Sequence, residues 1–125
     1  MNFTTAVKTC VLKKYARFTG RACRSELWWF FLFGTLCGMA LLIVSAVLFP
    51  RGSKAMSVLF ALFYLALLLP NVAVQVRRLH DVNRSGWWIL LPLVPVVGSI
   101  ILLVWMCSRG SAGANRFGED PLASA

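Results

Sequence analysis

Three long apolar runs, over residues 28–49, 56–76 and 87–107, limit what this chain can fold into more than any other feature. As helices, runs of 21 or 22 residues would extend about 31 to 33 Å, close to the roughly 30 Å hydrocarbon core of a bilayer. Charged residues make up 14% of the chain, against about 25% in a soluble domain. We therefore predict an all-α integral membrane protein with three transmembrane helices.

The third run is interrupted near its middle by Pro92, Pro95, Gly98 and Ser99. A single kinked helix would cross the bilayer. A re-entrant hairpin that turns between Pro95 and Ser99 would instead have arms of about 15 Å, too short to cross. We favour the single span, and keep the hairpin as the alternative.

Two polar segments flank this membrane domain, which we place at 27–107. In the basic segment 1–26, an interfacial amphipathic helix and a frayed polar terminus are both compatible with the pattern. Five apolar residues recur there at helical spacing and would share one face: Phe3, Ala6, Val7, Cys10 and Val11. The segment 108–125 is rich in glycine and polar residues without periodicity, which predicts an irregular tail, with Phe117 as the residue through which it could fold back.

Basic residues are divided unevenly between the two sides that three spans would create. The N-terminal segment and the 77–86 loop hold nine Lys or Arg, and the other side holds four. Positive charge is concentrated in cytoplasmic loops. We therefore predict a multi-pass protein with a cytoplasmic N-terminus and a periplasmic tail.

The net charge of +9 fits topology signals and contact with the lipid bilayer and its anionic lipids. Aromatic residues do not alternate with basic ones as a base-stacking surface would, so we expect no nucleic-acid partner. Cysteines at positions 10, 23, 37 and 107 include no C-x-x-C pair, and the chain has one histidine. We therefore expect no metal site, no cofactor and, in a reducing cytoplasm, no disulfide.

Residues 70–88 carry the polar groups most suited to a functional role: P-N-V-A-V-Q-V-R-R-L-H-D-V-N-R-S-G-W-W. Asn71, Gln75 and Arg78 are spaced to form one helical stripe, which should face another helix or a wet cavity because lipid contact would be costly. Asp81 follows Arg78 by three residues, which permits an ion pair. We favour a polar seam between helices with an interfacial charge cluster over a substrate or ion site.

Gly34 and Gly38 form a G-x-x-x-G pair, a spacing that lets two helix backbones approach closely. Glycine is also common in membrane helices, so a packing seam and a chance spacing both remain open. Together with Asn71 and Gln75, these glycines are the predicted helix-packing residues.

Charged and tryptophan side chains near the predicted cytoplasmic surface are candidate contacts to lipid headgroups or to a partner. A second copy of the chain and another membrane protein are the candidate partners. The set of candidate contacts is Arg21, Arg24, Glu26, Arg77, Arg78, His80, Asp81, Arg84, Trp28, Trp87 and Trp88.

An enzymatic role has little support in the sequence. His80 and Asp81 could transfer protons, but adjacent helical residues point about 100° apart, so Asp81 would not orient His80 as a triad carboxylate does. We expect no enzyme, but a binding or assembly component with a basic cytoplasmic face. The alternative is a subunit of an oligomeric transporter or pore lined by Asn71, Gln75, Arg78, His80 and Asp81.

Three stretches match the pattern of one known family. Residues 18–28 resemble F-x-G-R-x-x-R-x-E-aromatic-W, residues 77–88 resemble R-R-L-H-D-x-G-x-S-G-W-W, and residues 110–121 resemble G-x-x-G-x-N-x-F-G-x-D-P. Leu27 replaces the aromatic residue and Asn83 a glycine. The chain thus resembles the small bacterial inner-membrane proteins of the domain-of-unknown-function 805 family, the YhaH type. This resemblance implies a protein of the bacterial inner (plasma) membrane, and implies no particular activity.

Overall fold

The structure is a computed structural model that describes residues 2–49 and 51–121. Its regular structure in these residues is helical, apart from one isolated β-bridge between Asn115 and Gly118. The elements in chain order are α1 (Phe3–Lys8), the π-helical turn η1 (Thr9–Lys13), α2 (Arg24–Leu48), α3 (Lys54–Asp81), the 3₁₀ helix η2 (Gly86–Leu93) and α4 (Val97–Cys107). The predicted all-α class is confirmed.

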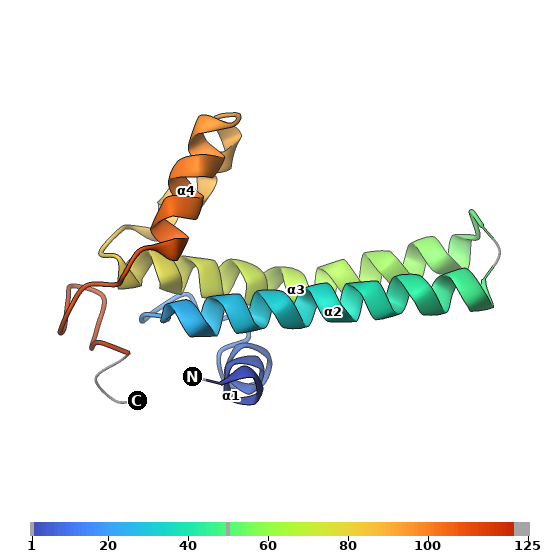
Figure 1. Ribbon diagram of the computed structural model, residues 1–125, viewed down its shortest axis with the longest axis horizontal. Helices are drawn as coiled ribbons and strands as arrows, with labels where there is room; N and C mark the ends of the chain where they lie inside the picture. The colour runs from blue at the N-terminus through green and yellow to red at the C-terminus, as the bar shows by residue number, and fades with distance from the viewer. Residues whose placement is uncertain (1, 50, 122–125) are drawn as a thin grey trace.

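Helices α2 and α3 lie side by side and antiparallel along the length of the molecule (Figure 1). With 25 and 28 residues, both are long and apolar enough to cross a membrane. Large apolar side chains such as Ile43 and Leu62 are 62% and 60% exposed. Such outward apolar surface suits a lipid environment. The start of α2 and the end of α3 meet at the end of the molecule that carries the other elements.

Helix α3 continues unbroken through Pro70. Proline has no N–H, so the carbonyl of Ala66, four residues earlier, loses its helical partner. The hydroxyl of Tyr15, in the segment after η1, donates a hydrogen bond to this carbonyl. Because lipid offers a freed carbonyl no water, the N-terminal segment supplies the missing donor from outside the helix.

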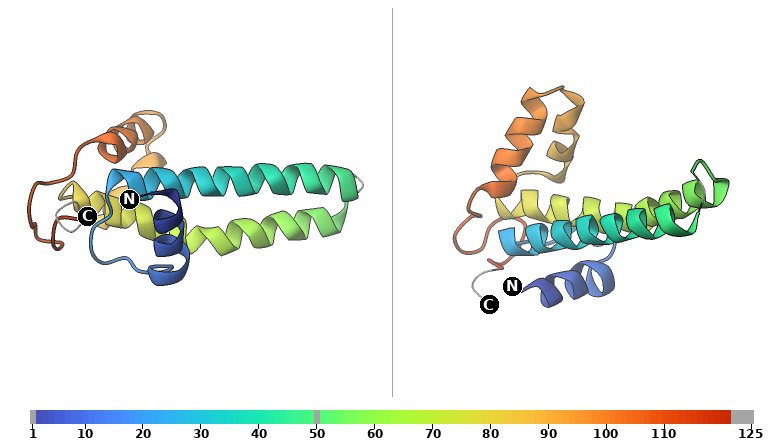
Figure 2. Two further views of the ribbon diagram at one scale, coloured as in Figure 1. Left: turned by 60° about the horizontal axis from the view of Figure 1, so that its bottom comes forward. Right: turned by 45° about the vertical axis from the view of Figure 1, so that its right-hand side comes forward.

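The N-terminal elements lie crosswise to α2 and α3, so that α1 is seen end-on in Figure 1 and from the side in Figure 2. Asn2 caps α1 by accepting a hydrogen bond from the N–H of Thr5 at 2.8 Å. Ala6 and Cys10 are buried, and the Phe3 ring packs edge-on against Trp29 of α2 with centroids 5.8 Å apart. The predicted apolar face therefore packs against the protein.

The prediction of a single helix over 87–107 is wrong. Helices η2 and α4 instead form the two arms of a hairpin (Figures 1 and 2). The rings of Trp88 and Trp105, one on each arm, lie 5.5 Å apart, whereas a continuous helix would separate these residues by about 25 Å. The hairpin was the alternative that the sequence left open.

Proline explains the break. Pro92 and Pro95 remove two helical donors, and the chain turns at Val94–Val96, where Val96 has a φ of 64°. Gly98 then lets the arms approach, since a Cβ built there would lie 1.8 Å from the Leu91 carbonyl oxygen. The hairpin returns the chain to its starting point, so the segment after α4 lies beside the end of α3.

The Tyr15 hydrogen bond gives the first prediction. Tyr15→Phe should lower the free energy of unfolding by about 1 to 3 kcal/mol, because it leaves the Ala66 carbonyl without a hydrogen-bond donor. In a Pro70→Ala background the same change should cost close to nothing, because residue 70 then supplies the N–H. Denaturant unfolding in detergent micelles measures both costs. Tyr64→Phe, at an exposed tyrosine, is the control, and equal costs in the two backgrounds would contradict this assignment.

Candidate functional site

Five charged residues from two segments form a buried group at the end of the molecule where α2 begins and α3 ends. Each of them is 5% exposed or less. We call this group the ion-pair cluster, and its members are Arg21, Glu26, Arg77, Arg78 and Asp81.

Helix geometry brings these charges together. Glu26 lies in the first turn of α2, where the helix dipole favours a carboxylate, and Arg78 lies in the last turn of α3, where it favours a cation. The backbone N–H of Ala22 donates to the Arg77 carbonyl at 3.0 Å, which fixes the segment before α2 against α3. The two helix ends therefore meet with opposite charges facing each other.

The first ion pair joins α2 to α3 through Glu26 and Arg77. The Cys10 thiol of η1 lies beside it, and donates to Glu26 Oε1 at 3.7 Å. Burial, and then the charge of Glu26, raise the pKa of the Cys10 thiol to about 12, so the thiol is protonated at neutral pH. Arg77 Nε is buried without a hydrogen-bond partner among the described residues.

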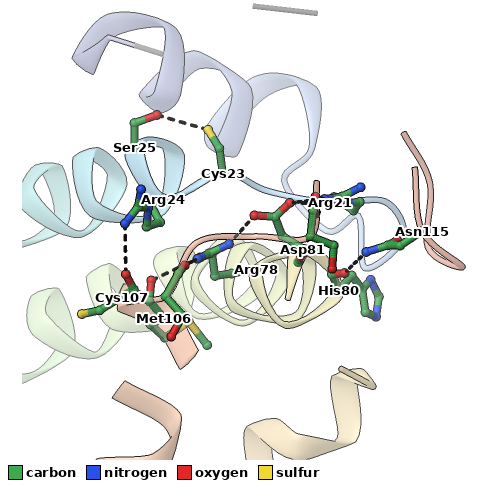
Figure 3. Close-up of polar contacts among 12 residues, drawn as sticks. Arg21, Cys23, Arg24, Ser25, Arg78, His80, Asp81, Met106, Cys107 and Asn115 are labelled. Carbon is green, nitrogen blue, oxygen red and sulfur yellow. Dashed lines mark hydrogen bonds and ion pairs between the residues drawn. The ribbon is translucent and has the colours of Figure 1, made fainter. Parts of the chain in front are cut away.

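The second group centres on Asp81, which pairs with two arginines (Figure 3). Arg21 Nε donates to Asp81 Oδ1 at 3.0 Å, and Arg78 binds the other carboxylate oxygen. Both guanidinium groups also reach the segment after α4. Arg78 donates to the Ser108 carbonyl through Nη2, and to the Met106 carbonyl in the last turn of α4 through Nε at 3.2 Å. Arg21 Nη1 donates to the Gly113 carbonyl at 2.6 Å.

His80 also contacts the segment after α4. Its ring stacks on Phe117 with centroids 4.1 Å apart, and its carbonyl accepts a hydrogen bond from Asn115 Nδ2 at 2.9 Å. His80 Nδ1 lies 2.9 Å from the Gly20 carbonyl. A carbonyl only accepts, so this nitrogen carries the proton in the neutral ring.

This arrangement is a junction of three segments: the one before α2, the end of α3 and the tail. Burying ions costs several kcal/mol each, and this cost is offset only when every ion keeps its partners. Here each arginine meets a carboxylate, and two of them also meet backbone carbonyls. The cluster therefore holds segments together, and its charges are used within the chain.

The predicted contact residues fall into two groups. Six are buried and bonded within the chain: Arg21, Glu26, Arg77, Arg78, His80 and Asp81. Five are exposed: Arg24, Arg84, Trp28, Trp87 and Trp88. Within the second group, Arg24 donates to the Cys107 carbonyl at 3.2 Å, and the Arg84 guanidinium lies 4.8 Å from the Trp105 ring centroid.

The predicted polar stripe is also divided. Asn71 and Gln75 line a cavity of about 270 Å³ beneath the hairpin, while Arg78 lies in the ion-pair cluster. Asn71 Nδ2 donates to the Leu67 carbonyl of its own helix at 3.0 Å. His80 and Asp81, the remaining members of the alternative transport path, are likewise bonded to neighbouring segments.

The Gly34–Gly38 pair faces α3 without close backbone contact. A Cβ built at Gly34 would meet the Leu67 side chain at 3.8 Å, and one at Gly38 would meet Phe63 at 3.7 Å. Both are ordinary van der Waals distances. Between α2 and α3, these glycines therefore leave room for large side chains and do not bring the backbones together.

Several site residues were missed by sequence reasoning. The tail was expected to be irregular and able to fold back through Phe117, which does contact the end of α3. Ser111 and Asn115 also contact the end of α3, and no prediction included them. The signal that could have found them is the third family pattern, whose fixed glycine, asparagine and phenylalanine spacing coincides with these contacts. Cys10 had no such signal.

The fold and the site define a small helical protein with two apolar helices long enough to cross a membrane and one charged junction. The chain belongs to the family described as protein of unknown function (DUF805), whose model matches residues 15–119. This match covers the whole ion-pair cluster, and it confirms the resemblance seen in the sequence.

Relatives in Escherichia coli (strain K12) cover most of the chain. The chain is 42% identical to inner membrane protein YhaI over 111 aligned residues, and this alignment covers 89% of the chain and 91% of YhaI. The chain is 41% identical to inner membrane protein YhaH over 111 residues, an alignment that covers 89% of the chain and 92% of YhaH. It is 39% identical over 130 residues to the uncharacterized protein YiiR, with 82% and 84% covered. No solved structure matches.

Gly110 gives the second prediction. A Cβ built there would lie 2.0 Å from Asp81 Oδ2. Gly110→Ala should therefore push the tail off the ion-pair cluster, at a cost of about 1 to 3 kcal/mol. We expect a lower melting temperature and faster trypsin cleavage after the exposed Arg109. Ala112→Ser, at an exposed neighbour, is the control. Identical melting and cleavage in the two variants would show that the tail does not pack against Asp81.

Proposed function

We propose that this chain is a protein of the bacterial inner membrane that crosses the bilayer twice and acts as a binding or assembly component without enzymatic activity. The end of the molecule that carries the ion-pair cluster, which we call the cluster end, lies in the cytoplasm and contacts anionic lipid. The names of YhaI and YhaH support the location. The lengths and apolar surfaces of α2 and α3 support the two crossings.

The distribution of charge supports this orientation. Eleven of the thirteen Lys and Arg lie at the cluster end or on the N-terminal segment beside it: Lys8, Lys13, Lys14, Arg17, Arg21, Arg24, Arg77, Arg78, Arg84, Arg109 and Arg116. Arg51 and Lys54 are the other two, at the opposite end. The imbalance is steeper than the nine to four of a three-span arrangement, and it favours a cytoplasmic cluster end with both terminal segments inside.

The hairpin fits this topology as an element of the cytoplasmic leaflet. No charged residue occurs from 85 to 108, and Trp87 and Leu93 are 80% and 79% exposed. Each arm measures about 16 Å, too short to cross a hydrocarbon core of about 30 Å. The hairpin points away from α2 and α3, crosswise to them (Figure 1). We therefore place it within one leaflet, with its apolar surface covered by acyl chains.

The proposed lipid contact rests on one observation, which is that some arginines at the cluster end are buried and others are exposed. The buried ones are bonded within the chain, while Arg24, Arg84 and Arg109 are exposed beside the hairpin and its tryptophans. Cations and tryptophans next to an apolar element are the groups that meet phosphates and the interfacial layer. Each such cation contributes about 1 kcal/mol toward an anionic leaflet.

The test compares two charge-neutralised variants of the full chain in nanodiscs of mixed phosphatidylglycerol and phosphatidylcholine. Arg24→Gln with Arg84→Gln removes two cations at the cluster end, and Arg51→Gln with Lys54→Gln removes two at the other end. The first pair should lower the preference for bound phosphatidylglycerol about thirtyfold, as two contacts of 1 kcal/mol imply. The second pair should change it severalfold less. Equal losses in the two variants would overturn the assignment of the lipid contact to the cluster end.

A further inference from the structure

Two adjoining cavities lie between α2 and α3, outside the ion-pair cluster. The first, of about 270 Å³, is roofed by the hairpin through Pro92 and Ser99. The second, of about 580 Å³, continues between the two long helices as far as Leu42 and Phe60. Phe31 and Asn71 line both cavities, so the two form one groove. Volumes of this size are typical of small-molecule sites.

The groove is apolar except at one point. Gln75 lines its roofed end, and its amide makes no hydrogen bond with any described residue. The nearby Asn71 amide is already bonded to the Leu67 carbonyl. A half-buried amide donor without a partner lowers its free energy by meeting an acceptor on a bound molecule.

The dimensions of the groove fit one acyl chain. From Gln75 to Phe60 the groove follows fifteen residues of α3, or about 22 Å at the helical rise, which exceeds the roughly 15 Å depth of one leaflet. A helix is 10 to 12 Å wide, too wide to pass beneath the hairpin into a cavity of 270 Å³. Gly34 and Gly38 widen the groove on the α2 side because they carry no side chain, while Leu67 and Phe63 line the groove from α3.

We infer that this groove holds one phospholipid of the surrounding bilayer, with an acyl chain between α2 and α3 and its ester carbonyl accepting a hydrogen bond from the Gln75 amide. The surrounding medium supplies this molecule, since α2 and α3 are the helices that lipid covers. Gln75 lies about 9 Å along α3 before Asp81 and next to the membrane side of the ion-pair cluster, which suits the depth of an ester linkage. The site recognises the chain and the ester, and goes beyond the headgroup contact proposed above.

Native mass spectrometry of the full chain tests this inference, with phosphatidylcholine as the added lipid. Its neutral headgroup removes any contribution of charge attraction. The wild-type protein should retain one lipid per chain. Thr35→Phe, which fills the groove, and Gln75→Leu, which removes the amide, should each lower retention at least tenfold. Leu36→Phe, at the next position but outside the groove lining, should retain the lipid as wild type does.

Three results would overturn the inference. Equal retention by all four proteins would show lipid bound only on the outer surface. Retention of no lipid by the folded wild type would show an empty groove. A dimer lost in Thr35→Phe would show that a second copy occupies the groove. The Arg24→Gln, Arg84→Gln variant should keep its phosphatidylcholine, so failure of the headgroup proposal and failure of this one give different results.

Discussion

The carboxylate of Asp81 is the contact on which the cluster end depends. It pairs with Arg21 from the segment before α2 and with Arg78 from its own helix, and both arginines donate to carbonyls of the segment after α4. Removing one partner from a buried ion pair typically costs 3 to 5 kcal/mol, because the remaining charge stays desolvated. Loss of Asp81 would strand two guanidinium groups at once. One short side chain thereby fixes the relative positions of three segments that are remote in sequence.

The path of the chain after α3 follows from this junction. For the tail to reach Arg21 and Asp81, residues 86–107 must leave the end of α3 and return to it. Prolines that break the run and a glycine that lets the arms meet make that return possible. The N-terminal segment contacts the same two helices at two points. Cys10 donates to Glu26 of the ion-pair cluster, and Tyr15 donates to the carbonyl that Pro70 leaves without a helical partner. Polar contacts thus organise a chain whose surface is largely apolar.

The sequence was sufficient for the class, the two long helices and the local Arg78–Asp81 pair, because period and spacing are local properties. It was not sufficient for the hairpin, since Pro92 and Pro95 are compatible with a kinked span, and only the tail contacts decide between the two. It made Arg21 and Arg77 candidate contacts to lipid or a partner and did not show their burial, because burial of a charge depends on partners that are distant in sequence. Asp81 is 60 residues from Arg21, and Glu26 is 51 residues from Arg77. The role of Asn115 was visible only as a family pattern, whereas Phe117 stood out as the large apolar residue through which a polar tail could fold back.

The central claim is that all three family patterns meet at one end of the molecule, and therefore on one side of the membrane. The most direct measurement is the side on which a reporter fused after Ala125 is active, in cells that also carry a reporter fused before residue 1. Our account predicts cytoplasmic activity for both fusions. A periplasmic C-terminal reporter would contradict it, because residues 87–107 would then cross the bilayer and the tail could not reach Asp81.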